Sequence, residues 1–262
     1  MSRKAPPGPA GGARLRAALP AFSVLGGGPE GAPVTLRPGV AGEGDLLDAV
    51  EGGTLAAAAR VWEAPRAVVA SRADARLPGF ADARRVLAAE GWPVEVRESG
   101  GSAVPHAPGI VHLSLAFRPP EGAPTTLEST YALLLEPLIR LVEGFGLPAD
   151  VGEVPGSFCD GRFNLVVGGR KLAGTAQRWR AGPGPAIPGR GAILAHALLL
   201  VDVDRSEATG AVNRFYQVAR ADRHFDADAL VTLAELLPET APRGRALVAE
   251  VGRRLRGLVA GC

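Results

Sequence analysis

Apolar residues along this chain follow two different spacings, which predicts a protein built from both helices and strands. Over residues 125–145, leucines and a tyrosine return every three or four positions, so this segment is expected to form a helix with one apolar face. Residues 192–203, AILAHALLLVDV, are apolar without a helical stripe, which indicates a strand in the centre of a sheet. The pattern therefore predicts an α+β fold.

Shorter segments of both kinds occupy the rest of the chain. Two β-prone runs at 163–167 and 171–177 are separated by Gly168-Gly169, and this arrangement predicts a hairpin with a tight turn. Segments rich in glycine and proline at 26–29 and 181–191 are expected to be a break and a mobile loop. Further helices are predicted over 44–59, 82–90, 212–219, 227–237 and 243–259, and further strands over 60–62, 67–70, 94–97 and 110–117.

Length and composition limit the chain to one sizeable core. Its 262 residues include 35 glycines and 23 prolines but few aromatic residues, which is typical of a soluble globular protein with many turns. Residues 1–20 contain basic residues, glycines and prolines without a long apolar run, so we expect them to be disordered. Residues 21–262 are predicted to form a single domain whose final part, from about residue 205, is helical.

Charge, cysteine content and histidine spacing exclude several classes of function. The 29 Lys and Arg residues nearly balance the 27 Asp and Glu residues and are scattered, which argues against nucleic-acid binding. No run reaches the roughly 18 to 20 apolar residues of a membrane span, and two cysteines are too few for a disulfide framework, so we expect a cytoplasmic protein. No metal-ligand spacing connects the four histidines, which are His106, His112, His196 and His224.

One cysteine and one lysine are the candidate reactive groups. Cys159 precedes the predicted hairpin and Lys171 begins its second strand, so the two side chains are expected to meet. A nearby ammonium group favours the thiolate, which is the reactive form of cysteine, and this suggests acyl transfer through a thioester. Without further context, a lone cysteine is more often a small buried apolar residue, and a lysine beside a glycine turn is more often solvated.

Three motifs occur in order along most of the chain. The loop at 97–104 reads RESGGSAV, the second hairpin strand reads KLAGTAQR over 171–178, and residues 198–204 read LLLVDVD. Together they resemble the lipoate–protein ligase and octanoyltransferase family, which also includes the biotin–protein ligases, over about residues 45–219. The resemblance implies the fold of that catalytic domain, in which helices flank a mixed, largely antiparallel sheet.

Within that family, the sequence GSFC at 156–159 is most similar to the cysteine-dependent octanoyltransferases. Those enzymes move an octanoyl group from the lysine of a carrier protein to the lysine of another lipoyl domain, so no cofactor is expected here. The ligases instead activate the free acid, for which ATP and Mg²⁺ would be needed, and often carry a C-terminal accessory domain larger than the tail after Asp204. They also commonly have glycine where Ser102 stands, because a side chain there crowds a nucleotide phosphate.

The resemblance implies a role for each reactive group. Cys159 is expected to attack the carbonyl of the donor octanoyl or lipoyl group and to form an acyl-enzyme. Lys171 is expected to polarise that carbonyl or to pair with the thiolate. Backbone N–H groups at 100–103 and 175–176 are the candidate oxyanion donors.

The same motifs imply where the acyl group binds. Val104, Leu113 and Leu115 are expected to line a slot for an eight-carbon chain, whose burial contributes about 0.8 kcal/mol per CH₂. The expected substrate-binding residues are Arg97, Ser99, Gly100, Gly101, Ser102, Ala103, His106, Gly174, Thr175 and Ala176.

The expected partners are proteins that carry the acyl group. The donor is an octanoyl- or lipoyl-carrying protein, and the acceptor is the lipoyl domain of a 2-oxoacid dehydrogenase or a glycine-cleavage carrier protein. Two alternatives remain open: an ATP-dependent lipoate–protein ligase that does not depend on Cys159, and a non-catalytic paralogue that binds lipoyl domains. The joint presence of Cys159 and Lys171 argues against the paralogue. The motifs assign no role to His196.

Overall fold

The computed structural model describes residues 9–25, 34–181 and 191–261. Its helices are α1 (Pro9–Ala18), α2 (Ala41–Glu51), α3 (Phe80–Ala89), α4 (Leu127–Glu143), α5 (Arg205–Val218), α6 (Leu233–Leu236) and α7 (Gly244–Ala260), with 3₁₀ turns η1 (Asp74–Arg76) and η2 (Ala227–Ala229). Its strands are β1 (Ser23–Leu25), β2 (Ala57–Trp62), β3 (Ala67–Ser71), β4 (Val94–Arg97), β5 (Val104–His106), β6 (Ile110–Phe117), β7 (Asp150–Gly152), β8 (Asn164–Val167), β9 (Arg170–Trp179) and β10 (Ile193–Leu200). The predicted break at 26–29 and residues 182–190 of the predicted mobile loop lie outside the described residues.

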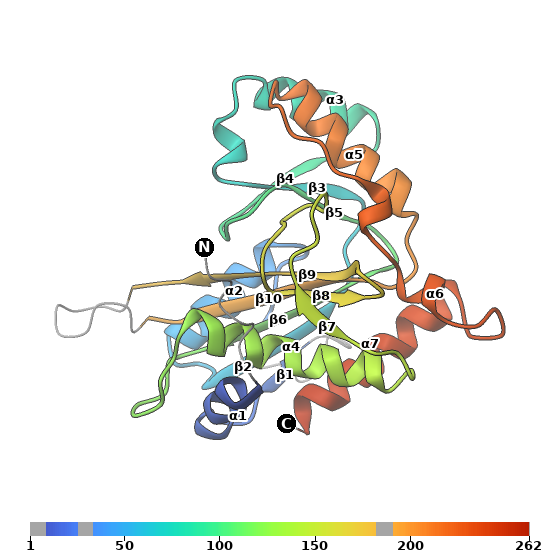
Figure 1. Cartoon of the computed structure of the whole chain (residues 1–262). Helices are drawn as coiled ribbons and strands as arrows, with labels where there is room; N and C mark the ends of the chain where they lie inside the picture. Colours follow the sequence, from blue (N-terminus) through green and yellow to red (C-terminus); the bar gives the residue numbers. More distant parts are fainter. Residues whose placement is uncertain (1–8, 26–33, 182–190, 262) are drawn as a thin grey trace, which may run out of the picture.

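Seven strands form the large sheet at the centre of the molecule (Figure 1), in the order β1-β2-β6-β10-β9-β8-β7. Neighbouring strands are antiparallel except β1 and β2, which run parallel. The middle strand is β10, and this confirms both the predicted central strand and the predicted fold class. The predicted hairpin is formed by β8 and β9, and its turn places Gly168 and Gly169 at φ values of 57° and 77°, which glycine adopts without steric cost.

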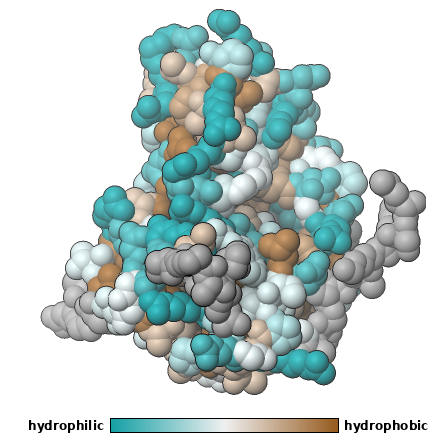
Figure 2. All heavy atoms as spheres, turned by 90° about the vertical axis from the view of Figure 1, so that its left-hand side faces the viewer, coloured by the Kyte–Doolittle hydropathy of each residue, from teal (hydrophilic) through white to brown (hydrophobic). Residues whose placement is uncertain are grey.

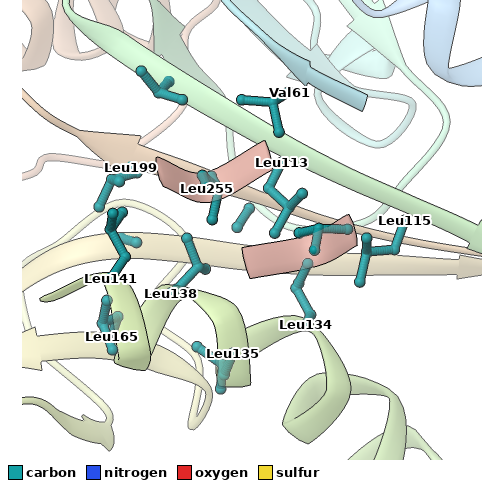
Figure 3. Packing of buried hydrophobic residues seen from close by; sticks show 14 of the residues in the cluster. Val61, Leu113, Leu115, Leu134, Leu135, Leu138, Leu141, Leu165, Leu199 and Leu255 are labelled. Atoms are coloured by element: carbon teal, nitrogen blue, oxygen red, sulfur yellow. The ribbon is translucent and has the colours of Figure 1, made fainter. Parts of the chain in front are cut away.

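One face of the large sheet packs against α4 and α7 (Figure 3), and α1 lies against α4. Leu113 of β6 belongs to this core, together with Leu138 of α4 and Leu255 of α7. The start of α4 is a capping box: the Thr126 hydroxyl accepts from the Ser129 N–H, and the Ser129 hydroxyl accepts from the Thr126 N–H. The capping box therefore stabilises the start of the helix that the spacing of apolar residues predicted.

The opposite face of the large sheet carries α2 and a smaller lobe, which stands above the sheet in Figure 1. This lobe contains a second sheet in the order β4-β3-β5, with α3 and α5 packed on it. Phe215 and Tyr216 of α5 are fully buried in its core. Figure 2 shows the lobe as a narrower part of the molecule, where hydrophilic residues surround patches of hydrophobic residues on the visible surface. This face of the large sheet is therefore covered by α2 and by a small lobe that has a hydrophobic core of its own.

The start of the described chain is helical where the sequence predicted disorder. The prediction for residues 1–20 is wrong for α1, whose Leu15 is buried in the core with α4. A Cβ added at Gly12 would lie 2.8 Å from the Cβ of Ala132. Glycine therefore lets the two helices approach closely, and this packing stabilises a segment of low helix propensity. Residues 1–8 lie outside the described residues.

Two helices are shorter than the sequence predicted. Gly53, at φ 79°, turns the chain after α2, so this helix ends at Glu51 and the following residues enter β2. The helix predicted over 227–237 is replaced by η2, an extended segment and the single turn of α6. In the extended segment, the Val231 N–H donates to the Lys171 carbonyl oxygen at 3.0 Å. Backbone pairing with β9 therefore replaces helical hydrogen bonds at this point.

Candidate active site

A narrow cavity of about 30 Å³ lies between the small lobe and the large sheet. Its walls come from β4, β5, β6, β9, β10 and the loop at 153–163. The predicted site residues that line it are Arg97, His106, Cys159, Lys171, Gly174, Thr175 and Ala176. The remaining predicted residues, 99–103, form the loop between β4 and β5, and part of this loop contacts Cys159.

The β4–β5 loop holds Cys159 in an unusual backbone conformation. Its φ is 49°, in the left-handed region that residues other than glycine rarely adopt. The Cys159 N–H donates to Ser102 Oγ at 2.8 Å, and the thiol donates to the Ser102 carbonyl oxygen at 3.3 Å. Sγ also lies 3.4 Å from both the Ser102 hydroxyl and Arg97 Nη2. Strained backbone conformations of this kind cluster at active sites, where contacts with the surrounding residues hold the backbone in place.

Two cations favour the thiolate form of Cys159. Burial alone raises the pKa of a thiol, but the charges of Arg97 and Lys171, together with hydrogen bonds from Ser102 and Arg97, lower the pKa of Cys159 below its ordinary value. Arg97 is itself buried, and an arginine guanidinium is a lasting positive charge in proteins. The thiolate is the nucleophilic form of cysteine, so this environment activates Cys159.

The ammonium group of Lys171 binds backbone carbonyls beside Cys159. Its Nζ is fully buried and donates to the Cys159 carbonyl oxygen at 3.1 Å and also to that of Phe158. A Cβ on Gly174 would lie 3.0 Å from the Lys171 Cε, so glycine leaves room for the lysine chain. Burial lowers the pKa of Lys171 to about 8. The direct contact with sulfur that was expected of Lys171 is made by Arg97 instead.

Glycine is required on the side of the β4–β5 loop that faces the thiol. Gly101 has φ 101°, and a Cβ there would lie 2.7 Å from Cys159 Sγ. The end of the loop is anchored on α5, because the Ala103 N–H donates to Tyr216 Oη at 2.7 Å and Tyr216 donates to Asp74 Oδ1 at 2.9 Å. The Ala103 N–H is therefore occupied and is not an oxyanion donor in this arrangement.

The predicted apolar slot is only partly present. Val104 and Leu198 line the cavity, but Leu113 and Leu115 pack in the core on the opposite face of the large sheet. Successive side chains of a strand alternate between the two faces, so the residue of β6 that reaches the cavity is His112. The prediction that Leu113 and Leu115 line the slot is therefore wrong.

Two of the histidines on the cavity wall are buried and neutral. The rings of His106 and His112 have centroids 4.2 Å apart, and Trp62 stacks on His112 at 4.3 Å. Burial, followed by the nearby charge of Arg97, lowers the pKa of His106 to about 3. Burial, followed by His106, also lowers the pKa of His112 far below its ordinary value. Both rings are therefore uncharged at neutral pH.

A third histidine, His196 of β10, belongs to a polar network that the sequence did not predict. Its Nδ1 lies 3.0 Å from Glu43 Oε1, and its Nε2 lies 2.8 Å from Ser99 Oγ. The Ser114 hydroxyl also donates to Glu43 Oε1, at 2.7 Å. Burial opposes ionisation of Glu43, but the charge and hydrogen bond of His196 and the hydrogen bond of Ser114 lower its pKa to about 2. No motif connects Glu43 with the other residues, so no sequence signal identified it.

Metal clusters and membrane-spanning helices are both missing from the residues that the structure describes. No three His, Cys, Asp or Glu side chains among them are placed to hold an ion. None of their helices combines the length and apolar character needed to cross a bilayer.

The fold is that of a lipoate–protein ligase catalytic domain. Lipoate-protein ligase A bound with ATP superposes with a TM-score of 0.60 at 16% identity, covering 91% of this chain and 85% of that chain. A bipartite lipoate protein ligase of Thermoplasma acidophilum gives a TM-score of 0.57 at 15% identity, covering 92% and 84%. Identities this low show the fold alone.

Sequence comparison identifies the family. Residues 40–244 match the lipoyl protein ligase A/B catalytic domain. The chain is 36% identical over 208 residues to an uncharacterized protein of Cupriavidus necator, covering 76% of this chain and 82% of that protein. It is 41% identical over 184 residues to the octanoyl-[GcvH]:protein N-octanoyltransferase of Kyrpidia tusciae, covering 68% of this chain but only 62% of the transferase. The chain belongs to the lipoyl protein ligase A/B family, which confirms the resemblance of its three motifs.

Proposed function

We propose that this chain transfers an octanoyl or lipoyl group through a Cys159 thioester to a specific lysine of a lipoyl domain. The observation that carries the proposal is the Cys159 thiol, which faces the cavity beside the Arg97 guanidinium and has a lowered pKa. Relatives named octanoyl-[GcvH]:protein N-octanoyltransferase, at 41% and 32% identity, support an octanoylated carrier protein as the donor.

The reaction consists of two acyl transfers. In the first, the Cys159 thiolate attacks the donor carbonyl, a C–S bond forms and the bond to the donor lysine nitrogen breaks. In the second, the acceptor lysine nitrogen attacks the thioester, a C–N bond forms and the thiolate leaves. The buried charges of Arg97 and Lys171 favour the thiolate before the first step and after the second.

Ser102 supports the transferase over the ATP-dependent ligase. Its hydroxyl accepts from the Cys159 N–H and lies beside the sulfur, so this side chain positions the nucleophile. The corresponding ligase position commonly has a glycine, which leaves space for a nucleotide phosphate. We therefore propose that the reaction requires neither ATP nor Mg²⁺.

Binding of the acyl chain requires the cavity to widen. A volume of about 30 Å³ admits one or two water molecules, which is far less than an eight-carbon chain needs. The walls that would separate are Val104 of the small lobe and Leu198 of the large sheet. We propose that the acyl group enters between these two layers.

An intact-mass measurement tests the proposal. The protein is mixed with an octanoylated carrier protein in the absence of ATP, beside a Cys159→Ala variant. Both chains carry Cys262→Ser, because that second cysteine, which lies outside the described residues, is a competing thiol. We expect one octanoyl increment on the protein with Cys159 and none on Cys159→Ala.

Other outcomes would identify the alternatives. Lipoylation of a lipoyl domain only after ATP, Mg²⁺ and free lipoate are added, with Cys159→Ala fully active, would make the protein a ligase. Binding of the lipoyl domain without any acyl transfer would identify a non-catalytic paralogue.

A further inference from the structure

The chain from Glu43 through His196 to Ser99 has the geometry of an acid–base catalyst. A carboxylate, an imidazole and a hydroxyl follow one another at 3.0 Å and 2.8 Å, in the same order as in enzymes that activate a nucleophile through histidine. His196 lines the cavity that also contains Cys159, and Ser99 belongs to the loop that holds Cys159. Attack by the thiolate itself requires none of these three residues.

The network determines which nitrogen of His196 exchanges protons. Ionised Glu43 is an acceptor only, so Nδ1 of His196 carries a hydrogen and donates it to Oε1. In the neutral ring, Nε2 is then the acceptor and receives the Ser99 hydroxyl hydrogen. When the ring is protonated, the adjacent carboxylate stabilises its charge. Proton exchange therefore takes place at Nε2, on the side of the β4–β5 loop.

The other ionisable groups around the cavity are less suited to this role. Lys171 donates two of its three hydrogens to the backbone carbonyls of Phe158 and Cys159, beside the nucleophile, and a guanidinium does not release its proton in proteins. His106 Nδ1 and His112 Nε2 are buried without a hydrogen-bond partner among the described residues, and none of the carboxylates in that part of the chain is hydrogen-bonded to either ring. Of the histidines on the cavity wall, only His196 has this support.

We propose that His196, oriented by Glu43 and connected through Ser99, is the acid–base catalyst for the bonds to lysine nitrogen, an inference that rests on the proposed function. In the first transfer, protonated His196 supplies a proton through Ser99 to the donor lysine nitrogen as the C–N bond breaks. In the second, the acceptor amine attacks and its nitrogen loses a proton to Ser99 Oγ, while the Ser99 hydrogen moves to His196 Nε2. The C–S bond breaks, and the thiolate and protonated imidazole are both restored.

In this assignment, His196 is needed when a bond to a lysine nitrogen breaks or forms. It is not needed when Cys159 takes the acyl group from a thioester. A departing lysine nitrogen must be protonated, whereas a thiolate leaves without a proton. Loss of His196 is therefore expected to slow transfer from or to a lysine and to spare the loading of Cys159 from a thioester. A residue that only supported the structure of the site would affect both reactions alike.

The experiment compares the two donors directly. His196→Gln, Glu43→Gln and Ser99→Ala are each loaded from octanoyl-N-acetylcysteamine, a thioester, and loading is followed by intact mass. A lipoyl domain is then added, and transfer from the acyl-enzyme is followed in a single turnover. For His196→Gln we expect thioester loading near the wild-type rate and transfer to lysine slowed about 100-fold or more, the usual contribution of a general acid–base group. His224→Gln, an exposed histidine, is the matched control.

Each result decides the assignment. Slow transfer in all three variants with normal thioester loading is the expected result. Transfer at the wild-type rate by His196→Gln would overturn the proposal, and so would an equal loss of both reactions. Absence of any Cys159 adduct in the wild-type protein would instead show that the proposed function itself is wrong.

Discussion

At the scale of single residues, Arg97 has the most direct influence on the reactivity of Cys159. Its Nη2 lies 3.4 Å from Sγ, whereas the Lys171 ammonium is directed at backbone carbonyls. The same Nη2 donates to the Gly100 and Ser102 carbonyl oxygens at 3.0 Å and 2.7 Å. One guanidinium therefore both shapes the β4–β5 loop and stabilises the thiolate.

Replacement of Arg97 by Gln is expected to raise the pKa of the Cys159 thiol. Removing a positive charge in contact with sulfur destabilises the thiolate, so the pH midpoint of alkylation moves upward by about 1 unit or more. The measurement is the rate of iodoacetamide alkylation against pH in a Cys262→Ser background. Arg85→Gln, an exposed arginine of α3, is the control and should keep the wild-type midpoint. An unchanged midpoint in Arg97→Gln would show that other groups lower this pKa.

At the scale of elements, the β4–β5 loop shows how two adjacent glycines differ in role. A Cβ added at Gly100 meets nothing within 4 Å, whereas one at Gly101 meets Cys159 Sγ at 2.7 Å and Arg97 Nη2 at 3.0 Å. In the sequence the two glycines are adjacent, and nothing there distinguishes the role of Gly100 from that of Gly101. Only the path of the loop across the cavity distinguishes them.

Gly101→Ala is expected to displace the thiol and to slow octanoyl adduct formation by about tenfold or more, as misplacement of a reacting group does. The new methyl group also occupies a backbone at φ 101°, which costs about 1–2 kcal/mol. Gly122→Ala is the matched control, because φ there is 74° and the added Cβ meets no atom. Adduct formation and thermal unfolding are measured on both variants. If both lose stability and neither loses activity, the contact with sulfur has no functional importance.

At the scale of the whole molecule, we propose that α7 belongs to the same folding unit as the large sheet. The match to the family ends at residue 244, where α7 begins. Leu247, Val251 and Leu255 of α7 are nevertheless completely buried in the core beneath that sheet. Burial of each such side chain contributes about 1.5–3 kcal/mol. The summed contribution of the three side chains is therefore comparable to the free energy of unfolding of an ordinary domain.

A chain that ends at Arg243 is expected to lose its cooperative thermal transition. Removal of α7 exposes the apolar face of the large sheet, so the shortened protein should bind a hydrophobic dye or precipitate. Circular dichroism during heating provides the measurement. Arg253→Ala, on the exposed side of α7, should change stability by no more than about 0.5 kcal/mol. A shortened chain that unfolds cooperatively at the temperature of the full chain would show that α7 is a separate appendage.

Elements with strong local periodicity were predictable and those held by tertiary contacts were not. The strands β4 and β6 and the helix α4 lie where alternation and helical spacing placed them. α1 has weak helix propensity and depends on α4, and the segment around Val231 pairs with β9 although its sequence is helical in pattern. Periodicity reports which face of a segment is apolar. It does not report which distant segment will cover that face.

The sequence by itself determined the family, the central strand and the motifs that meet at the cavity, because these depend on residue types at short spacing. Only the tertiary structure decided that Arg97 contacts the sulfur, that His112 rather than Leu113 faces the cavity, and that Glu43 reaches His196. These contacts join segments far apart in the chain. They depend on how α2 and the small lobe pack on one face of the large sheet, and no local pattern of residues records that packing.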